Sequence, residues 1–137
     1  MTQEQQKDLL YKNLCARLPY YVRVNYKGDI YDVLGITHGR LVLCKPFQSQ
    51  VLAYCPLVEE VKPYLFPISI MSDEQKKEYN SWKHLVPVCH YEYGDVVEEY
   101  ELWDSPESFE YLIENHFDYN RLIEEGLAID ATNKNIY

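Results

Sequence analysis

The chain has 137 residues, 47% of them hydrophobic, and a formal net charge of −9. This hydrophobic content is enough for a core and argues against wholesale disorder, and the length fits one domain or a small barrel with a helical appendage. Because the first residues are polar and no apolar run approaches the roughly 18 residues that span a bilayer, neither a signal peptide nor a membrane span is predicted, and we expect a soluble, cytoplasmic protein.

The first predicted element is a helix that begins after Thr2. Thr2 and Gln5 have the spacing of a capping box, in which each side chain accepts a hydrogen bond from the backbone of the other. Apolar residues then recur with a helical period and share one face: Leu10, Tyr11, Leu14, Cys15 and Leu18. Pro19 ends the helix, because its ring removes a backbone donor and restricts the residue before it.

Residues 21–67 predict a small, strongly bent β-sheet around which the rest of the chain is arranged. Apolar and polar side chains alternate in short segments, and Gly28 and Gly39 mark the turns between them. Gly35 lies inside the second segment and indicates a bulge or a sharp bend. Such bends curl a short sheet, so we expect a partly closed barrel.

The last part of this stretch predicts a fourth short strand at Val51–Cys55, which stops at Pro56. Residues Lys62–Pro67 include two prolines, and proline cannot donate a hydrogen bond to a neighbouring strand. We therefore interpret this segment as an edge strand or an extended segment that lies across the barrel.

A second helix is predicted to start at Asp73, because Ser72 and Gln75 form another capping box. It should run to about Lys83 on the surface, with little apolar content.

Two strands, Leu85–Cys89 and Tyr91–Trp103, are then predicted to meet near His90–Gly94. The acids in the second strand indicate a solvated face or an edge that resists pairing.

The C-terminal region predicts two more helices. Ser105 followed by Pro106 is a strong helix start, and the apolar residues after it predict a buried face: Phe109, Leu112, Ile113 and Phe117. Asp118 can cap a short helix from Tyr119 to Glu125, and Gly126 predicts a left-handed C-cap. Residues 130–137 are expected to be frayed.

Together these elements predict an α+β fold. A small bent antiparallel sheet or SH3-like barrel covers about residues 20–67, flanked by the N-terminal helix and by a C-terminal helical region with an extra hairpin. The predicted division is 1–70 for the first helix and barrel and 71–137 for the rest, packed on the first part as one unit.

Two segments carry a resemblance to a known group of proteins. At Lys62–Leu65 and at His116–Ile129 the chain resembles uncharacterised small proteins of phages and mobile elements of gut-dwelling anaerobes. The resemblance implies a cytoplasmic accessory protein and carries no functional residue over to this chain. The order of strands and glycines in Tyr21–Pro67 is similar to SH3-like barrels, which concerns fold and not function.

The net negative charge is concentrated in one part of the sequence. Residues 1–83 carry 11 Lys/Arg against 9 Asp/Glu, a net of +2, whereas residues 84–120 carry 10 acids and no Lys or Arg. That block would repel phosphate backbones and attract a basic partner.

No motif for catalysis, a cofactor or a metal rises above background. The five glycines form no phosphate-binding loop, and the four histidines and four cysteines are scattered. Adjacent carboxylates such as Glu98-Glu99 point to opposite faces of a strand, so they do not converge. We predict no catalytic residue, no cofactor and no metal, with a Cys–His pair, a zinc site at Cys89-His90 and a divalent-cation site within 92–104 as the alternatives.

The sequence therefore favours a non-enzymatic interaction module with an acidic, tyrosine-rich surface that meets a basic protein partner. Its 14 tyrosines either fill the rim of a small core or line that surface. The predicted partner-binding residues are Tyr91, Tyr93, Glu98, Glu99, Tyr100, Glu101 and Asp104.

A sharper version makes this surface a mimic of a nucleic-acid backbone. The alternative is weak nucleic-acid binding by the barrel, through a basic and aromatic face in which Tyr21, Tyr26 and Tyr31 are interleaved with basic residues. These are Lys7, Lys12, Arg17, Arg23, Lys27, Arg40 and Lys45.

Overall fold

The computed structural model describes residues 1–46 and 55–137, which fall into two compact units. The first unit comprises residues 1–70 and 113–137, and the second comprises residues 71–112. Residues 113–137 are thus grouped with residues 1–70, and the second unit lies between them in the sequence. The predicted strand at Val51–Cys55 lies, except for its last residue, outside the described residues.

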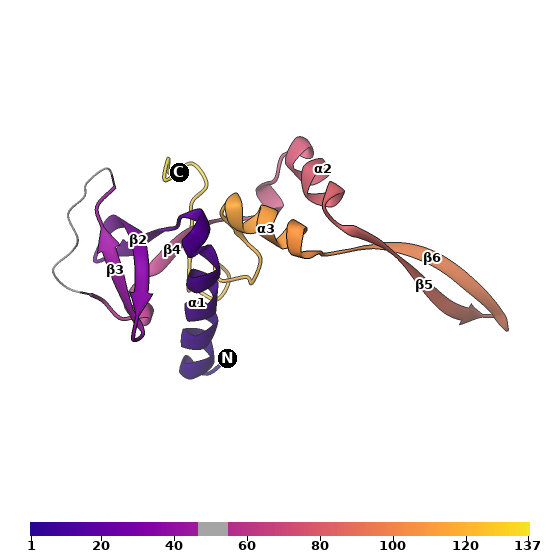
Figure 1. Ribbon diagram of the computed structural model, residues 1–137, viewed down its shortest axis with the longest axis horizontal. Coiled ribbons are helices and arrows are strands. Elements are labelled where there is room, and N and C mark those ends of the chain that lie inside the picture. Colours follow the sequence, from indigo (N-terminus) through magenta and orange to yellow (C-terminus); the bar gives the residue numbers. More distant parts are fainter. Residues whose placement is uncertain (47–54) are drawn as a thin grey trace. The chain divides into compact units, whose positions relative to one another are not determined.

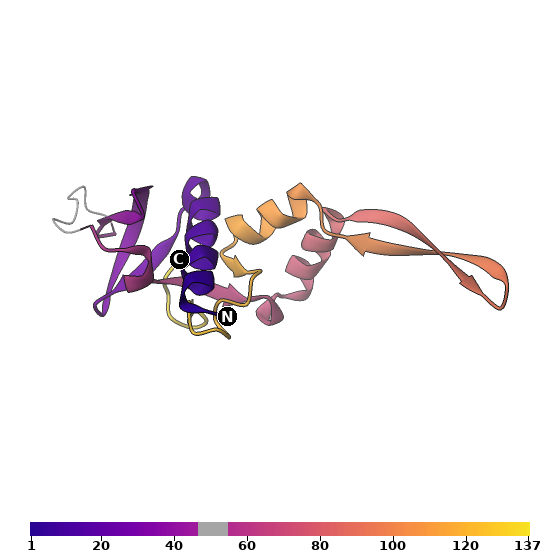
Figure 2. The same ribbon diagram turned by 90° about the horizontal axis from the view of Figure 1, so that it is seen from below.

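The fold is α+β, with an N-terminal helix, a mixed sheet and a second small sheet (Figures 1 and 2). The described elements of the first unit are α1 (Gln3–Arg17), η1 (Leu18–Tyr20), β1 (Arg23–Tyr26), β2 (Asp29–Thr37), β3 (Arg40–Cys44), η2 (Val58–Glu60), β4 (Lys62–Pro67), η3 (Ile68–Ile70), β7 (Phe117–Asp118) and β8 (Ile129–Asp130). Those of the second are α2 (Asp73–Ser81), β5 (His84–Glu92), β6 (Asp95–Trp103) and most of α3 (Pro106–Glu114).

Helix α1 begins with the predicted capping box. The Thr2 hydroxyl accepts a hydrogen bond from the Gln5 N–H at 3.2 Å, and the Gln5 side chain accepts one from the Thr2 N–H at 2.9 Å. The buried face differs in part from the prediction. Tyr11 is exposed, whereas the fully buried Asn13 and Arg17 share the face with Leu10 and Leu14 at helical spacings of three and four.

The mixed sheet has the strand order β3-β2-β1-β4-β7, with β8 also pairing with β4. Tight turns at Lys27-Gly28 and His38-Gly39 connect the first three strands, and both residues of each turn have positive φ. This conformation matches the twist of the strands that it joins. The predicted bulge is confirmed, since the register of β2 against β3 shifts between Val33 and Gly35.

The sheet does not close, so the predicted SH3-like barrel is not confirmed. Strand β3 stands at one end of the order and β7 at the other, and no pairing joins them in the described part of the chain. The bulge bends β2, but the sheet remains an open layer beside α1.

Strand β4 corrects the prediction of an edge strand. It pairs antiparallel with β1 and parallel with β7 and β8, so it lies inside the sheet. Each neighbour pairs with only two residues of β4. Short pairings leave no long ladder for Pro63 and Pro67 to interrupt, which is why the strand tolerates them.

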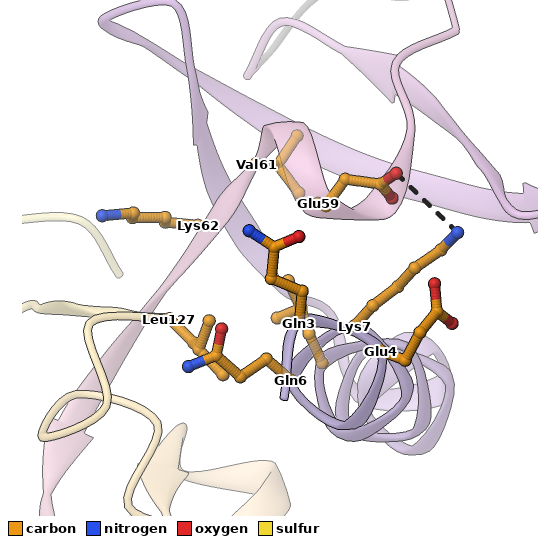
Figure 3. A pocket seen from close by; sticks show the side chains of 9 residues that line it. Gln3, Glu4, Gln6, Lys7, Glu59, Val61, Lys62 and Leu127 are labelled. Carbon is orange, nitrogen blue, oxygen red and sulfur yellow. Dashed lines mark ion pairs between the residues drawn. The ribbon is translucent and has the colours of Figure 1, made fainter. Parts of the chain in front are cut away.

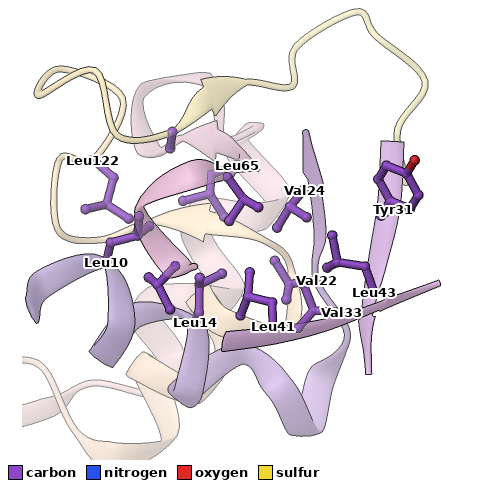
Figure 4. Packing of buried hydrophobic residues seen from close by; sticks show 13 residues of the cluster. Leu10, Leu14, Val22, Val24, Tyr31, Val33, Leu41, Leu43, Leu65 and Leu122 are labelled. Atoms are coloured by element: carbon purple, nitrogen blue, oxygen red, sulfur yellow. The ribbon is translucent and has the colours of Figure 1, made fainter. Parts of the chain in front are cut away.

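The hydrophobic core of the first unit lies between α1 and the sheet (Figure 4). Its buried members come from the helix, five strand or loop segments and the C-terminal region: Leu10, Leu14, Val22, Val24, Tyr31, Val33, Leu41, Leu43, Val58, Val61, Leu65, Leu122 and Ala128. Residues more than 100 positions apart in sequence meet here, so the core ties the two ends of the chain together.

The predicted helix at Tyr119–Glu125 is wrong, because these residues form turns. Asp118 stabilises these turns instead, since its carboxylate accepts hydrogen bonds from the N–H groups of Leu122 and Ile123, each at 2.9 Å. The left-handed cap at Gly126 is confirmed by its φ of 73°. Its N–H donates to the Ile123 carbonyl at 3.1 Å, and the Leu127 N–H donates to that of Leu122 at 2.8 Å, which together make a Schellman pattern.

Residues 130–137 are not frayed, contrary to the prediction. Ile136 is buried, and its carbonyl accepts a hydrogen bond from the Arg23 guanidinium. The Tyr137 hydroxyl accepts from the Arg23 N–H at 3.0 Å and donates to the Tyr64 carbonyl at 2.8 Å. One hydroxyl thereby bridges β1 and β4 at a point where the two strands do not pair directly.

Helices α2 and α3 of the second unit begin where the sequence predicts, each with a capping serine. Ser72 and Gln75 form the capping box of α2, and the Ser105 hydroxyl accepts from the Ser108 N–H at 3.1 Å at the start of α3. The buried face of α3 was predicted incorrectly in one respect, because Phe109 is 43% exposed and Tyr111 is buried beside Leu112. Phe117 is buried as predicted, but in β7.

Candidate interaction surface

The predicted hairpin is present as β5 and β6, referred to below as the hairpin (residues 84–103). Its strands are joined in nine directly opposed pairs, from His84 and Trp103 at the base to Glu92 and Asp95 at the tip. The turn consists of two residues with positive φ, 52° at Tyr93 and 83° at Gly94. Glycine adopts this conformation without strain, and the turn fixes the register of the whole hairpin.

Polar contacts within the second unit hold the base of the hairpin. The Tyr79 hydroxyl on α2 donates to the Asp104 carboxylate at 2.5 Å, and the Ser105 hydroxyl donates to the Trp82 carbonyl at 2.5 Å. Burial and the bond to Asp104 raise the pKa of Tyr79. The segments that enter and leave the hairpin are therefore fastened to each other, and Asp104 has a structural role.

The register divides the hairpin into two faces, because directly opposed residues of a sheet point to the same side. One face, referred to below as the apolar face, consists of Leu85, Pro87, Cys89, Tyr91, Val96, Glu98, Tyr100 and Leu102. Every residue of this face is exposed, with Tyr91 at 82%. Glu98 is its single charged member, and the Tyr100 hydroxyl donates to the Glu98 carboxylate at 3.4 Å.

The opposite face, referred to below as the acid-bearing face, consists of His84, Val86, Val88, His90, Glu92, Asp95, Val97, Glu99, Glu101 and Trp103. It holds four of the five carboxylates of the hairpin. The Trp103 indole N–H donates to the Glu101 carboxylate at 3.1 Å, and the His90 ring lies 3.9 Å from the Glu92 carboxylate. Three valines near the centre of this face are half-buried.

The structure divides the predicted partner-binding residues among three places. Tyr91, Glu98 and Tyr100 lie on the apolar face, and Glu99 and Glu101 lie on the acid-bearing face. Tyr93 occupies the turn and is 97% exposed, whereas Asp104 lies at the base. The sequence thus located the hairpin but not its sidedness, which depends on the register set by the two-residue turn.

A buried polar cluster in the first unit was missed from the sequence. Arg17 is fully buried and donates from Nε to Asn13 Oδ1 and from Nη2 to the Phe117 carbonyl, both at 2.6 Å. Its guanidinium also lies 5.2 Å from the centre of the Tyr119 ring. Burial lowers the pKa of Arg17. No local signal marks this arginine as buried, because its partner is 100 positions away in sequence.

His116 and Tyr137 extend this cluster. Their rings stack with centroids 3.6 Å apart and planes 9° apart. Burial lowers the pKa of His116 to about 4, and the guanidinium groups of Arg17 and Arg23 add to the effect. Burial likewise raises the pKa of Tyr137 to about 12. The histidine is therefore neutral at neutral pH.

A groove of about 400 Å³ lies between α1 and the segment from η2 to β4 (Figure 3). Its lining consists of Gln3, Glu4, Gln6, Lys7, Leu10, Glu59, Val61, Lys62 and Leu127. Lys7 and Glu59 form an ion pair across it at 3.8 Å. The lining contains no histidine, cysteine or hydroxyl group, so it offers no nucleophile with a base.

Several of the basic residues proposed for nucleic-acid binding have a structural partner in the first unit. Arg17 is buried, and Arg23 is held by Asp32 at 2.9 Å. Three of the lysines have carboxylate partners: Lys7 with Glu59, Lys12 with Asp8 and Lys45 with Asp29.

Within the described residues, no three His, Cys, Asp or Glu side chains gather in an arrangement that could hold a metal ion. The four cysteines, all described, are free thiols. In the same part of the chain, no helix has the length and apolar character needed to cross a membrane.

No protein-family model, curated protein or solved structure matches the chain. Any functional conclusion must therefore come from the residues and their geometry.

Proposed function

We propose that the chain is a non-enzymatic protein-interaction module and that the hairpin binds a protein partner with a basic surface. One observation carries the proposal: both faces of a hairpin of nine residue pairs are open to solvent. Only Val86, Val88 and Val97 are half-buried among its strand residues, and the others are exposed.

An isolated two-stranded hairpin is marginally stable in water, because it has no layer to pack against. Large apolar side chains such as Leu85, Tyr91 and Leu102 would gain about 25 cal/mol for each Å² that a partner covers. Contiguous exposed apolar patches mark interaction sites in soluble proteins. The hydrogen bond from Tyr79 to Asp104 holds the base of the hairpin and leaves the rest of the two strands available for contact.

The negative charge of the hairpin favours a partner with a basic surface. Residues 84–120 contain no Lys or Arg, so every formal charge at neutral pH in the hairpin is negative. A partner surface with Lys or Arg around an apolar strip complements both properties. Attraction between such surfaces accelerates association and weakens as salt rises.

Site-specific photo-crosslinking in the native host tests the proposal. A benzophenone amino acid replaces Tyr91 or Tyr100 on the hairpin, or the exposed Tyr11 on α1 as a control. We expect the hairpin positions to crosslink to one discrete protein that the Tyr11 position does not capture. That protein, once purified, should bind the chain more slowly at high salt than at low salt.

A shortened variant provides the matched loss-of-function test. Asn-Gly replaces residues 87–100, so that the opposed pair Val86 and Glu101 flanks the new turn. Binding of the purified partner should be lost while α2 and α3 keep their contacts. Unchanged binding by this variant, or the absence of any hairpin-specific crosslink, would contradict the proposal.

The acid-bearing face also supports the narrower proposal that the partner is a nucleic-acid-binding protein and that the hairpin mimics a backbone. Asp95, Glu99 and Glu101 lie on one side of β6, so their charges form a row. Replacing Glu99 and Glu101 by lysine should abolish inhibition of such a partner, and inhibition that survives would refute mimicry. Origin in a phage or mobile element stays a prediction.

A further inference from the structure

We propose that the outer edge of β6 adds an extended strand of the partner, in which basic and apolar residues alternate. This inference rests on the proposed function and names the binding mode and the kind of segment bound. It follows from the two-residue turn, from one proline and from the distribution of charge along β6.

The turn determines which backbone groups of the hairpin are free. In a hairpin with a two-residue loop, the flanking pair exchanges both hydrogen bonds, and bonded and non-bonded pairs then alternate. The hairpin of β1 and β2 follows this rule, because the Val33 N–H donates to the Val22 carbonyl at 3.1 Å, four residues before Tyr26 at the turn.

The same alternation from Glu92 and Asp95 leaves every second residue of each strand with its N–H and carbonyl directed outward. The outward residues are those of the apolar face: Leu85, Pro87, Cys89 and Tyr91 on β5, and Val96, Glu98, Tyr100 and Leu102 on β6. Among the described residues, no other strand pairs with either edge.

The two edges differ in their capacity to pair. Pro87 lies in the middle of the β5 edge and has no N–H, so that edge lacks a central donor. Tyr100, directly opposite on β6, keeps its N–H, and so do the other outward residues of that strand. An added strand can therefore form a continuous ladder only on β6.

The side chains of β6 define the sequence of the added strand. Neighbours on one side of the sheet would be chiefly Asp95, Glu99 and Glu101, which favour Lys or Arg at the cross-strand positions. Val97 and Trp103 lie on the same side. Neighbours on the other side would be chiefly Val96, Tyr100 and Leu102, which favour apolar residues. The bound segment therefore alternates basic and apolar residues, as in other cases of strand addition.

The same charges disfavour a second copy of this chain. Pairing of two β6 edges would place carboxylates opposite carboxylates on the acid-bearing face, with no Lys or Arg of the hairpin to neutralise them. The acids thus act against self-association and in favour of a basic strand.

Peptide binding to the full chain provides the first test. The probe is a nine-residue peptide that alternates lysine and valine, and its control has the same composition with all lysines before all valines. We expect the alternating peptide to bind at least tenfold more tightly and to shift the backbone NMR signals of Val96, Glu98 and Tyr100. Equal binding of the two peptides would overturn the proposal, since charge alone would explain it.

Backbone methylation of the peptide isolates the ladder from side-chain effects. Methyl groups on the peptide nitrogens of one alternating set should abolish binding, and those on the other set should leave it within about twofold. If the peptide binds antiparallel to β6, methylation of the valine nitrogens should abolish binding. If it binds parallel, methylation of the lysine nitrogens should do so. Strand addition would be overturned if methylation of the two sets weakened binding equally, or if neither weakened it. This test requires no substitution in the protein.

Two proline variants test the edge on the protein itself. Glu98→Pro removes an outward donor from β6, and Cys89→Pro removes one from β5 directly opposite. We expect Glu98→Pro to lose peptide binding at least tenfold and Cys89→Pro to keep it, with circular dichroism and the NMR signals of α2 and α3 unchanged in both. Glu98→Gln separates the loss of charge from the loss of the donor.

The outcomes distinguish this inference from the proposed function. If the crosslinked partner still binds Glu98→Pro but not the shortened variant, the interaction module stands and strand addition is wrong. If neither Glu98→Pro nor the shortened variant changes the binding of any crosslinked protein, both proposals fail. Self-association in sedimentation experiments that Glu98→Pro abolishes would identify a second copy as the occupant and overturn the basic strand.

Discussion

The core beside α1 and the hairpin of β5 and β6 use apolar side chains in opposite ways. In the core, Leu14, Leu41 and Leu65 are fully buried and come from a helix and two strands. In the hairpin, side chains of similar size, such as Leu85 and Tyr91, are exposed. The comparison shows that the first unit buries its apolar residues in its own core, whereas the hairpin leaves side chains of similar size exposed to solvent.

The strongest way to test this contrast is to truncate a core leucine. Leu14→Ala should reduce the free energy of unfolding by about 2–5 kcal/mol, because it removes a fully buried side chain and leaves a cavity. Urea denaturation followed by circular dichroism measures the change. The exposed Leu85→Ala serves as control, and a loss of comparable size there would show that the hairpin is buried in the folded chain.

A change of pH tests the polar cluster of the first unit. His116 has a pKa of about 4 in the fold and about 6.5 when unfolded, so the unfolded chain binds the proton first. Its contribution to stability is present above pH 6.5 and is lost as the pH falls to about 4. The difference corresponds to about 3 kcal/mol for a shielded ring, and partial exposure reduces it to about 1–2 kcal/mol.

The measurement is urea denaturation from pH 7 to pH 4 of the natural chain, of His116→Gln and of His84→Gln. The decrease should be smaller in His116→Gln and unchanged in His84→Gln, whose ring is exposed on the hairpin. Identical pH profiles for all three proteins would rule out His116 as the responsible group.

An effect of similar size is expected at the hydroxyl that bridges β1 and β4. Tyr137→Phe removes the acceptor of the Arg23 N–H and the donor to the Tyr64 carbonyl, at a cost of about 1–2 kcal/mol. Tyr93→Phe removes a hydroxyl from a fully exposed ring and should change stability by less than about 0.5 kcal/mol. Thermal denaturation compares the two, and equal stabilities would mean that residues 130–137 do not secure the sheet.

The smallest change is expected on the apolar face. Tyr100→Ser combined with Leu102→Thr should alter the free energy of unfolding by less than about 0.5 kcal/mol, because neither side chain is buried. The same variant should nevertheless lose partner binding. If it is destabilised as strongly as Leu14→Ala, the apolar face belongs to the protein's own core.

Features encoded by neighbouring residues could be predicted from the sequence. The capping boxes at Thr2 and Ser72 and the left-handed Gly126 each depend on a few consecutive positions. The hairpin itself was also predictable, from two strand-like segments around Gly94. Local chemistry determines these features, so no knowledge of the remaining chain was required.

Features that depend on distant residues could not be predicted in this way. Arg17 is buried because it meets Phe117, and residues 130–137 are ordered because Tyr137 meets Tyr64. The interior position of β4 depends on β7 and β8, which follow much later in the sequence. The candidate site was predicted as a set of residues but not as two faces, because a shift of one residue at the turn exchanges the faces.

The second unit interrupts the first, since residues 71–112 lie in sequence between β4 and its parallel partners β7 and β8. Pairing of β7 and β8 with β4 therefore closes a loop that contains this whole segment. Because the entropy of closing a loop grows only slowly with its length, adding or removing residue pairs in the hairpin changes that cost little. The reach of the hairpin can thus vary during evolution, or in an engineered series, while the sheet that anchors it stays the same.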